Sequence, residues 1–132
     1  MIQVLIVDDH TIVRKGIKQL LDDTQDIRIQ GESYNASDMF KKIRFESYDI
    51  VLLDISLPGR SGVEALKQLK EMKPDLPVLI LSMYPEDQYA LRVMKAGASG
   101  YLTKESAPEE LVHAIRTISK GKKYISTSLA EE

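Results

Sequence analysis

Two short apolar runs limit the folds open to this chain more than any other feature of its sequence. "DIVLLD" (49–54) and "VLILS" (78–82) are almost wholly apolar, as is typical of parallel strands that helices cover on both faces. Each is followed by a stretch with apolar residues at helical spacing, "GVEALKQLKEM" and "EDQYALRVMKAG". We therefore expect two central strands, each leading into an amphipathic helix.

The same alternation of a short apolar run and a helix-period stretch occurs five times. It begins with "VLIV" and ends with "GYLT" and "APEELVHAIRTISKG", where Pro108 and Gly121 mark the start and end of a helix. "IRIQGES" (27–33) alternates apolar and polar residues, which predicts an edge strand with one wet face. Five βα units without a hairpin signal predict an α/β fold with one doubly wound, five-stranded parallel sheet.

Length and composition fit one soluble globular domain. The 132 residues include 43% hydrophobic and 29% charged residues, no cysteine, and a net charge of -2, which exclude a disulfide scaffold and a thiolate metal centre and give no electrostatic signal for nucleic acid. The N-terminus lacks a basic leader, and no apolar window reaches the length of a membrane span. We expect a cytoplasmic protein that does not bind the membrane, with a domain at 1–121 and a tail or the start of an interdomain linker at 122–132.

Polar residues stand where the predicted strands end. Asp8 and Asp9 follow the first strand, Asp54 ends the third, Ser82 ends the fourth, and Lys104 follows the fifth. Doubly wound sheets bind ligands outside the carboxyl ends of their strands. If the first, third, fourth and fifth strands are neighbours, these side chains converge on one small patch.

Three carboxylates held this close repel one another, and a divalent cation is the simplest remedy. Mg²⁺ prefers oxygen ligands, which Asp8, Asp9 and Asp54 supply. At an exposed strand edge Asp54 has a pKa of about 4 and is ionised at neutral pH, so it can attack phosphorus without a separate general base. Lys104 and Ser82 are suited to bind the oxygens of the resulting aspartyl phosphate.

The segments "VDDH", "VLLDISLPGRSGVEAL", "VLILS" and "GASGYLTK" occur here in the order and spacing of the receiver domain of two-component response regulators. The chain resembles that family over residues 1 to about 120. The resemblance implies a flavodoxin-like (βα)5 sheet of strand order 2-1-3-4-5, and a domain that catalyses its own phosphorylation and dephosphorylation at Asp54. It implies Mg²⁺ ligands at Asp8, Asp9, Asp54 and the Ser56 carbonyl, and switch residues at Ser82, Tyr101 and Lys104.

Residues 102–132 further resemble the subgroup in which a linker and a LuxR/NarL-type helix-turn-helix domain follow the receiver. That second domain is absent from this sequence, which is either a stand-alone receiver or a fragment that ends within the linker, and we favour the fragment. The resemblance implies a sensor histidine kinase as partner, a homodimer on phosphorylation, and control of transcription. Contact with DNA is expected only through the absent domain.

Three other functions deserve comparison. A haloacid dehalogenase-type phosphatase also uses an aspartate nucleophile, but it needs a second acid two residues later, where this chain has Ser56. A flavin or nucleotide binder would carry a glycine-rich phosphate loop, and no such motif is present. A degenerate receiver used only for interaction would not need the full set of acids, hydroxyl and lysine.

Taken alone, each residue has a more ordinary interpretation. Asp8 and Asp9 are typical of a helix N-cap and its neighbour, and we interpret His10 and His113 as surface histidines. The chain also departs from the common family pattern, because Glu105 follows Lys104 where a proline is usual. Met83 stands where many members carry a small residue. The predicted convergence of the polar strand ends is what favours the functional interpretation.

Overall fold

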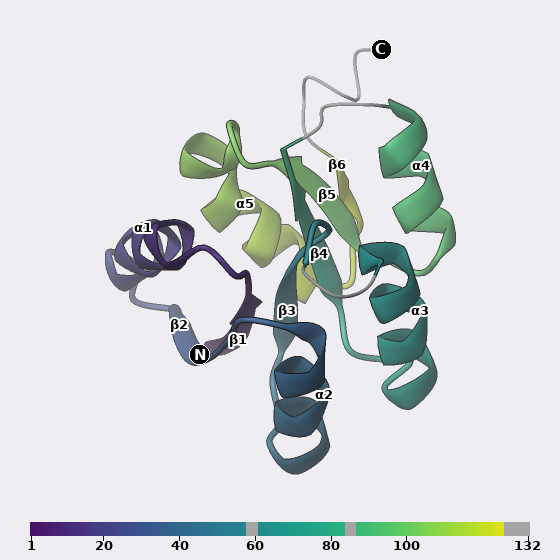
Figure 1. The fold of residues 1–132 in the computed structure, drawn as a ribbon. Coiled ribbons are helices and arrows are strands. Elements are labelled where there is room, and N and C mark those ends of the chain that lie inside the picture. The colour runs from purple at the N-terminus through teal and green to yellow at the C-terminus, as the bar shows by residue number, and fades with distance from the viewer. Residues whose placement is uncertain (58–60, 84–86, 126–132) are drawn as a thin grey trace.

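The computed structural model describes residues 1–57, 61–83 and 87–125. In these residues, one parallel sheet has the strand order β2-β1-β3-β4-β5-β6 (Figure 1). The strands are β1 (Ile2–Val7), β2 (Ile27–Ser33), β3 (Ile50–Asp54), β4 (Val78–Ser82), β5 (Gly100–Thr103) and β6 (Tyr124–Ile125). The helices are α1 (Thr11–Asp22), α2 (Ala36–Phe45), α3 (Gly62–Met72), α4 (Asp87–Lys95) and α5 (Ala107–Ser119). No helix among the described residues has the length and apolar character needed to cross a membrane.

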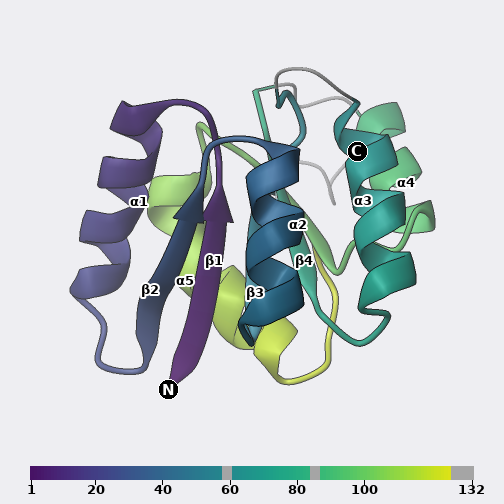
Figure 2. The same ribbon diagram turned by 60° about the horizontal axis from the view of Figure 1, so that its bottom comes forward.

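Helices cover the sheet on both faces, as the uninterrupted apolar strands predict. α1 and α5 lie on one face, and α2, α3 and α4 lie on the other (Figure 2). Side chains of a strand alternate between its two faces; in β3, Ile50 and Leu52 belong to the core under α1 and α5, whereas Val51 and Leu53 belong to the opposite core. Every residue of β3 and β4 is buried, which confirms that these two strands are central.

The predicted strand order is confirmed from β2 to β5, but the predicted number of strands is wrong. Tyr124 and Ile125 form a sixth strand that pairs in parallel with Gly100 and Tyr101. The chain leaves α5 through Gly121, whose positive φ of 86° turns it back along the sheet, and the amide of Tyr124 donates to Ser99 O at 2.9 Å. A two-residue strand has too little pattern to be recognised in the sequence.

Tyr124 is held by side-chain contacts as well. Its hydroxyl donates to Glu110 Oε1 at 2.6 Å, and its ring forms a T-shaped pair with the His113 ring, with centroids 5.6 Å apart. A Cβ at Gly100 would stand 2.7 Å from the carbonyl oxygen of Tyr124, so the close approach of β6 to β5 requires a glycine there. β6 lies beyond residue 121, the expected end of the domain, and the position of that boundary remains a prediction.

Candidate functional site

The carboxyl ends of β1, β3, β4 and β5 form one edge of the sheet, and the predicted polar residues lie along it. Asp54 is in register with Leu81 of β4, and Ser82 is in register with Thr103 of β5. The amide of Lys104 donates to Ser82 O at 2.7 Å. The amide of Asp8 donates to Ser33 O, at the end of β2, at 3.0 Å. Regular pairing between neighbouring strands thus brings together side chains that lie far apart in the sequence.

Lys104 connects two of the carboxylates. Its Nζ lies 3.0 Å from Asp8 Oδ2 and 3.3 Å from Asp54 Oδ2. Asp8 is fully buried, Asp54 is 1% exposed, and the Lys104 side chain is 16% exposed. Burial disfavours the ammonium, but the adjacent carboxylates of Asp8 and Asp54 outweigh it, so the pKa of Lys104 lies above its ordinary value.

Asp54 is more buried than the sequence analysis assumed. Asp54 is almost fully buried rather than at an exposed edge, and the expectation of an ordinary pKa of about 4 is therefore wrong. Burial and the nearby charge of Asp8 raise the pKa of Asp54, against the effect of the Ser56 amide and Lys104. The Ser56 amide donates to Asp54 Oδ1 at 2.9 Å, which orients the carboxylate.

Four side chains at this edge are close enough to share a metal ion. One ligand atom from each of Asp8, Asp9, His10 and Asp54 lies within 4.8 Å of the others. Three carboxylates against the single ammonium of Lys104 leave an excess of two negative charges, which one divalent cation would neutralise. The oxygen donors of the buried Asp8 and Asp54 and of the exposed Asp9 suit a hard ion such as Mg²⁺. The residues therefore fit the expected cofactor.

The remaining predicted site residues lie close by. Ser82 is fully buried at the end of β4, and Tyr101 is fully buried in the core beneath α3 and α4. Met83 is 66% exposed, so its side chain extends into solvent at the site. The Lys104–Glu105 peptide, where the family usually has a proline, is trans.

Two residues that contact the acids were missed by the sequence analysis. His10 was interpreted as a surface histidine, and its side chain is 56% exposed, but Nδ1 lies 3.1 Å from Asp8 Oδ1 and 3.2 Å from Asp9 Oδ1. Arg14, on the first turns of α1, donates from Nη1 to the carbonyl oxygen of Asp8 at 2.5 Å. The sequence signal for such contacts is weak: His10 and Arg14 follow Asp8 and Asp9 closely in the chain.

The alternative interpretation of Asp8 as a helix N-cap can also be compared with the structure. His10 is the N-cap residue of α1, and its side chain makes no capping hydrogen bond. Asp8 Oδ1 instead accepts from the backbone amide of His10 at 2.8 Å. Asp8 therefore holds the turn that leads into the helix, and its carboxylate remains within the cluster.

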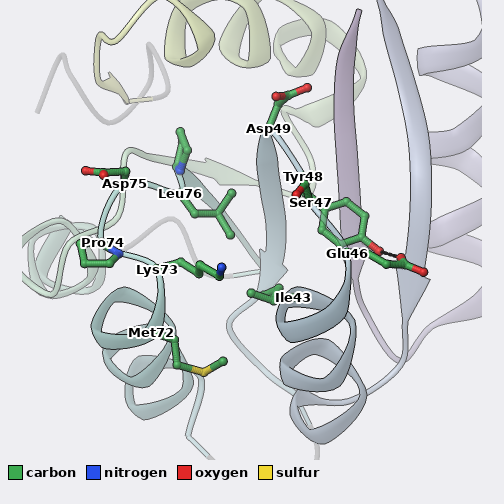
Figure 3. Close-up of a pocket in the computed structure, with 11 residues that line it drawn as sticks. Ile43, Glu46, Ser47, Tyr48, Asp49, Met72, Lys73, Pro74, Asp75 and Leu76 are labelled. Atoms are coloured by element: carbon green, nitrogen blue, oxygen red, sulfur yellow. Dashed lines mark hydrogen bonds between the residues drawn. The ribbon is translucent and has the colours of Figure 1, made fainter.

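A cavity of about 400 Å³ lies at the opposite edge of the sheet, along the connections that lead into β3 and β4 (Figure 3). Two of its acidic side chains already have partners, since Glu46 accepts a hydrogen bond from the hydroxyl of Tyr48 and Asp49 Oδ2 accepts one from the amide of Gln3. Burial and the neighbouring Glu46 raise the pKa of Tyr48, so this hydroxyl stays protonated. The cavity takes no part in the strand-end cluster.

Comparison with known proteins agrees with this geometry. The family model of the response regulator receiver domain matches residues 4–116. Response regulator UvrY of Escherichia coli strain K12 is 40% identical over all 132 residues, which correspond to 61% of UvrY. The chain thus spans about three fifths of the length of the curated relatives it matches.

Solved structures show the same fold. A two-component response regulator of the LuxR family from Aurantimonas sp. SI85-9A1 has a TM-score of 0.93 and 36% identity, covering 98% of this chain and 93% of that one. The isolated receiver domain of RcsB from Salmonella enterica serovar Typhimurium, solved with the phosphomimetic BeF3-, has a TM-score of 0.92 and 26% identity, covering 98% and 96% of the two chains.

Proposed function

Because the chain belongs to the family of response regulator receiver domains, we propose that it accepts a phosphoryl group on Asp54 from a sensor histidine kinase. In this proposal the reaction depends on Mg²⁺, and the domain also catalyses the later loss of the phosphoryl group. The relatives support it, since UvrY is named a response regulator and the RcsB domain was solved with a mimic of a phosphoryl group.

The observation that carries the proposal is the burial of Asp8 and Asp54 against a single lysine. Removing charged groups from water is costly, and an ion pair between them seldom repays that cost in stability. Here the cluster also holds more negative than positive charge. Such an arrangement is expected where a cation and a charged reactant bind, which is what phosphoryl transfer to Asp54 requires.

In the proposed reaction a carboxylate oxygen of Asp54 attacks the phosphorus of the donor's phosphohistidine. The O–P bond forms as the P–N bond breaks, and the imidazole leaves with the electron pair of that bond, neutral because its other nitrogen carries a proton. Lys104 and Ser82 donate hydrogen bonds to the oxygens of the bound phosphoryl group. In the later dephosphorylation, water attacks the phosphorus of the aspartyl phosphate, which restores the carboxylate of Asp54 and releases inorganic phosphate.

Asp8, Asp9 and Asp54 are the carboxylates that would hold Mg²⁺, together with the backbone carbonyl of Ser56. When bound, the ion neutralises charge on the transferring phosphoryl oxygens and favours the ionised form of Asp54. This contribution matters here because burial raises the pKa of Asp54. Lys104 supplies one positive charge to two of these carboxylates, Asp8 and Asp54.

Ser82 and Tyr101 are proposed as the switch residues. Ser82 ends β4, and Tyr101 lies in the adjacent strand β5, in register with Ile80 of β4. We infer that the Ser82 hydroxyl moves toward the phosphoryl group while the ring of Tyr101 occupies the core behind it. The surface formed by α4, β5 and α5 then changes, so a charge added at Asp54 alters a distant face.

The proposal extends beyond the receiver domain only through the relatives. UvrY is longer than this chain, and the Aurantimonas structure is assigned to the LuxR family. We propose that phosphorylation promotes a homodimer and regulates transcription through a helix-turn-helix domain, in the cytoplasm. DNA contact by the receiver itself forms no part of the proposal.

The test is incubation of the protein with Mg²⁺ and acetyl phosphate, followed by intact and peptide mass measurement. We expect one added phosphoryl group on the peptide that contains Asp54, and none after metal removal. Asp54→Asn should take up no label, whereas Asp75→Asn, at an exposed position near the opposite edge of the sheet, should be labelled like the wild type. Stoichiometric labelling of Asp54→Asn would refute the assignment. A folded, Mg²⁺-binding wild type that is labelled neither by acetyl phosphate nor by a kinase would indicate an interaction-only receiver.

A further inference from the structure

His10 adds a nitrogen donor to the oxygen donors of the acid cluster. Its Nδ1 lies 3.1 Å from Asp8 Oδ1 and 3.2 Å from Asp9 Oδ1. Zn²⁺ binds imidazole nitrogen and carboxylate oxygen at about 2.0–2.2 Å. Two ligand atoms bound to one ion at a right angle therefore stand about 3 Å apart, given those bond lengths. The three atoms are therefore already spaced like neighbouring ligands of one ion.

The backbone holds His10 in this position. It is the N-cap residue of α1, in the extended region with φ of -96° and ψ of 111°, and its amide donates to Asp8 Oδ1 at 2.8 Å. The acid and the imidazole are thus tied to the same short turn. A ligand placed by its backbone loses less conformational freedom when it binds a metal.

An independent observation concerns one oxygen of the buried Asp8 carboxylate. Asp8 Oδ2 is fully buried and accepts no hydrogen bond from the described residues. Its charged neighbour is Lys104 Nζ at 3.0 Å, and that ammonium is shared with Asp54 Oδ2 at 3.3 Å. Buried carboxylate oxygens without a hydrogen bond are rare, and coordination of a cation at the cluster would satisfy this one.

We propose that His10 makes this edge a mixed nitrogen–oxygen site, which binds Zn²⁺ and neighbouring first-row divalent ions in competition with Mg²⁺. The inference deepens the proposed function, since it rests on the metal-binding acids of that proposal. Mg²⁺ gains little from imidazole, because it prefers oxygen ligands and keeps several waters. Imidazole suits Zn²⁺, Co²⁺ and Ni²⁺, whose affinity for a given site exceeds that of the earlier divalent metals. His10 therefore affects metal choice more than Mg²⁺ binding.

A different role for His10 predicts the opposite effect. If the imidazole served only as a cationic partner of Asp8 and Asp9, a bound metal ion would have to displace it. Loss of the ring would then leave the affinity for every divalent ion unchanged or higher. The two roles are distinguished by the sign of the change in Zn²⁺ affinity, without any measurement of phosphoryl transfer.

The experiment is calorimetric titration of the protein with ZnCl₂ and, separately, with MgCl₂, for the wild type, His10→Ala and His113→Ala. The chain contains two histidines, and His113 lies on α5 in contact with Tyr124, so each variant removes one imidazole. We expect His10→Ala to weaken Zn²⁺ binding by about tenfold or more, since even outer partners of metal ligands contribute about 10–100-fold. Mg²⁺ affinity should be nearly unchanged, and His113→Ala should behave like the wild type.

Absorption of the Co²⁺ form gives a second measurement. The visible d–d bands of bound Co²⁺ should shift in His10→Ala and not in His113→Ala, because they report the ligand atoms directly. Unchanged Zn²⁺ affinity and unchanged Co²⁺ bands in His10→Ala would overturn the inference, as would an equal loss of Zn²⁺ and Mg²⁺ affinity. Phosphoryl labelling of the wild type with Mg²⁺ would still support the proposed function in that case. Conversely, His10-dependent Zn²⁺ binding without any labelling would support this inference and reject the proposed function.

Discussion

Lys104 Nζ lies 3.3 Å from Asp54 Oδ2, although 50 residues separate the two positions in the chain. Asp54 ends β3 and Lys104 follows β5, and β4 lies between these strands. The contact thus depends on the parallel pairing of three strands, and it places a positive charge beside the proposed phosphoacceptor. The energetic consequences of this pair can be measured without phosphorylation.

Replacement of Lys104 with methionine should destabilise the protein most when no metal is present. The variant leaves Asp8 and Asp54 buried without their ammonium, and we expect a loss of up to about 3 kcal/mol, the lower end of the cost of breaking a buried pair. Mg²⁺ should restore part of the loss because it supplies the missing charge. Urea unfolding with and without Mg²⁺ measures both effects.

Lys67→Met is the matched control for this prediction. Lys67 is exposed on α3, and its loss should change the free energy of unfolding by less than about 0.5 kcal/mol, as is usual for surface substitutions. Equal stability of the two variants in the absence of metal would contradict an energetic role for the Lys104 pair.

Asp54→Asn should make the stability of the protein less dependent on pH. The folded-state pKa of Asp54 is raised above its ordinary value of 3.8, first by burial and also by the charge of Asp8. The stability that the protonated carboxyl provides is therefore complete below that ordinary value and is lost as the pH rises through the folded-state pKa, at about 1.4 kcal/mol for each unit of the difference. Asparagine has no proton to lose, so the free energy of unfolding of the variant should increase relative to that of the wild type as the pH rises to neutral.

Urea unfolding of both proteins at several pH values from about 4 to 7, without metal, tests this sign. The difference in unfolding free energy between Asp54→Asn and the wild type should increase with pH, and Mg²⁺ should reduce it. A difference that stays constant across the range would mean that Asp54 titrates alike in the folded and unfolded chains.

Much of this fold could be predicted because its sequence signals are long and periodic. "VLILS" and "GYLT" correspond to β4 and β5 without an error at either end, since apolar runs bounded by polar residues define a buried strand well. The edge position of β2 followed from the polar residues of Ile27–Ser33. The strand order itself came from the family resemblance, because residue patterns do not specify which parallel strands are neighbours.

The parts that could not be predicted depend on tertiary contacts. The burial of Asp54 depends on how the end of β3 is packed, and the Ser56 amide also donates to its carboxylate. β6 consists of two residues, Tyr124 and Ile125, held by a register with β5 that leaves no periodic signal. The contact of His10 with the acids depends on a backbone turn and a side-chain rotamer, neither of which the residue types specify.

Arg14→Lys should weaken Mg²⁺ binding by disturbing Asp8 through its backbone. The Arg14 side chain is 17% exposed, donates to the Asp8 carbonyl oxygen at 2.5 Å, and approaches Glu32 Oε1 with Nε at 3.4 Å. A lysine ammonium lacks the planar fork that reaches both groups. We expect a loss of about 1–2 kcal/mol in stability and a several-fold loss in Mg²⁺ affinity, as for other outer partners of metal ligands, measured by urea unfolding and calorimetric titration.

Lys18→Met separates this effect from the contact with Glu32. Lys18 Nζ lies 3.0 Å from Glu32 Oε2 on the surface, and no hydrogen bond or ion pair joins it to Asp8 among the described residues. Its substitution should leave Mg²⁺ affinity unchanged. If both variants weakened Mg²⁺ binding equally, the effect would come from the charge of α1 and not from the position of Asp8.

Gly100→Ala should separate β6 from the sheet. A methyl group there would lie 2.7 Å from the backbone oxygen of Tyr124 and 2.9 Å from side-chain carbons of Ile118 and Leu79, and overpacking of this kind costs about 1–3 kcal/mol. β6 is a two-residue strand at the edge of the described sheet, so we expect it to move. Hydrogen exchange of the Tyr124 amide, which is bonded to Ser99 O at 2.9 Å, should become faster, and the free energy of unfolding should decrease.

Gly16→Ala provides the control because the same methyl group meets no atom within 4 Å at that position of α1. Alanine is favoured over glycine inside a helix, so this variant should gain about 0.5–1 kcal/mol in stability and leave the exchange of the Tyr124 amide unchanged. The opposite signs of the two glycine substitutions would show that space at Gly100, and not backbone entropy, decides the outcome there. A stabilised Gly100→Ala variant with a protected Tyr124 amide would show that β6 does not depend on the close approach of the two strands.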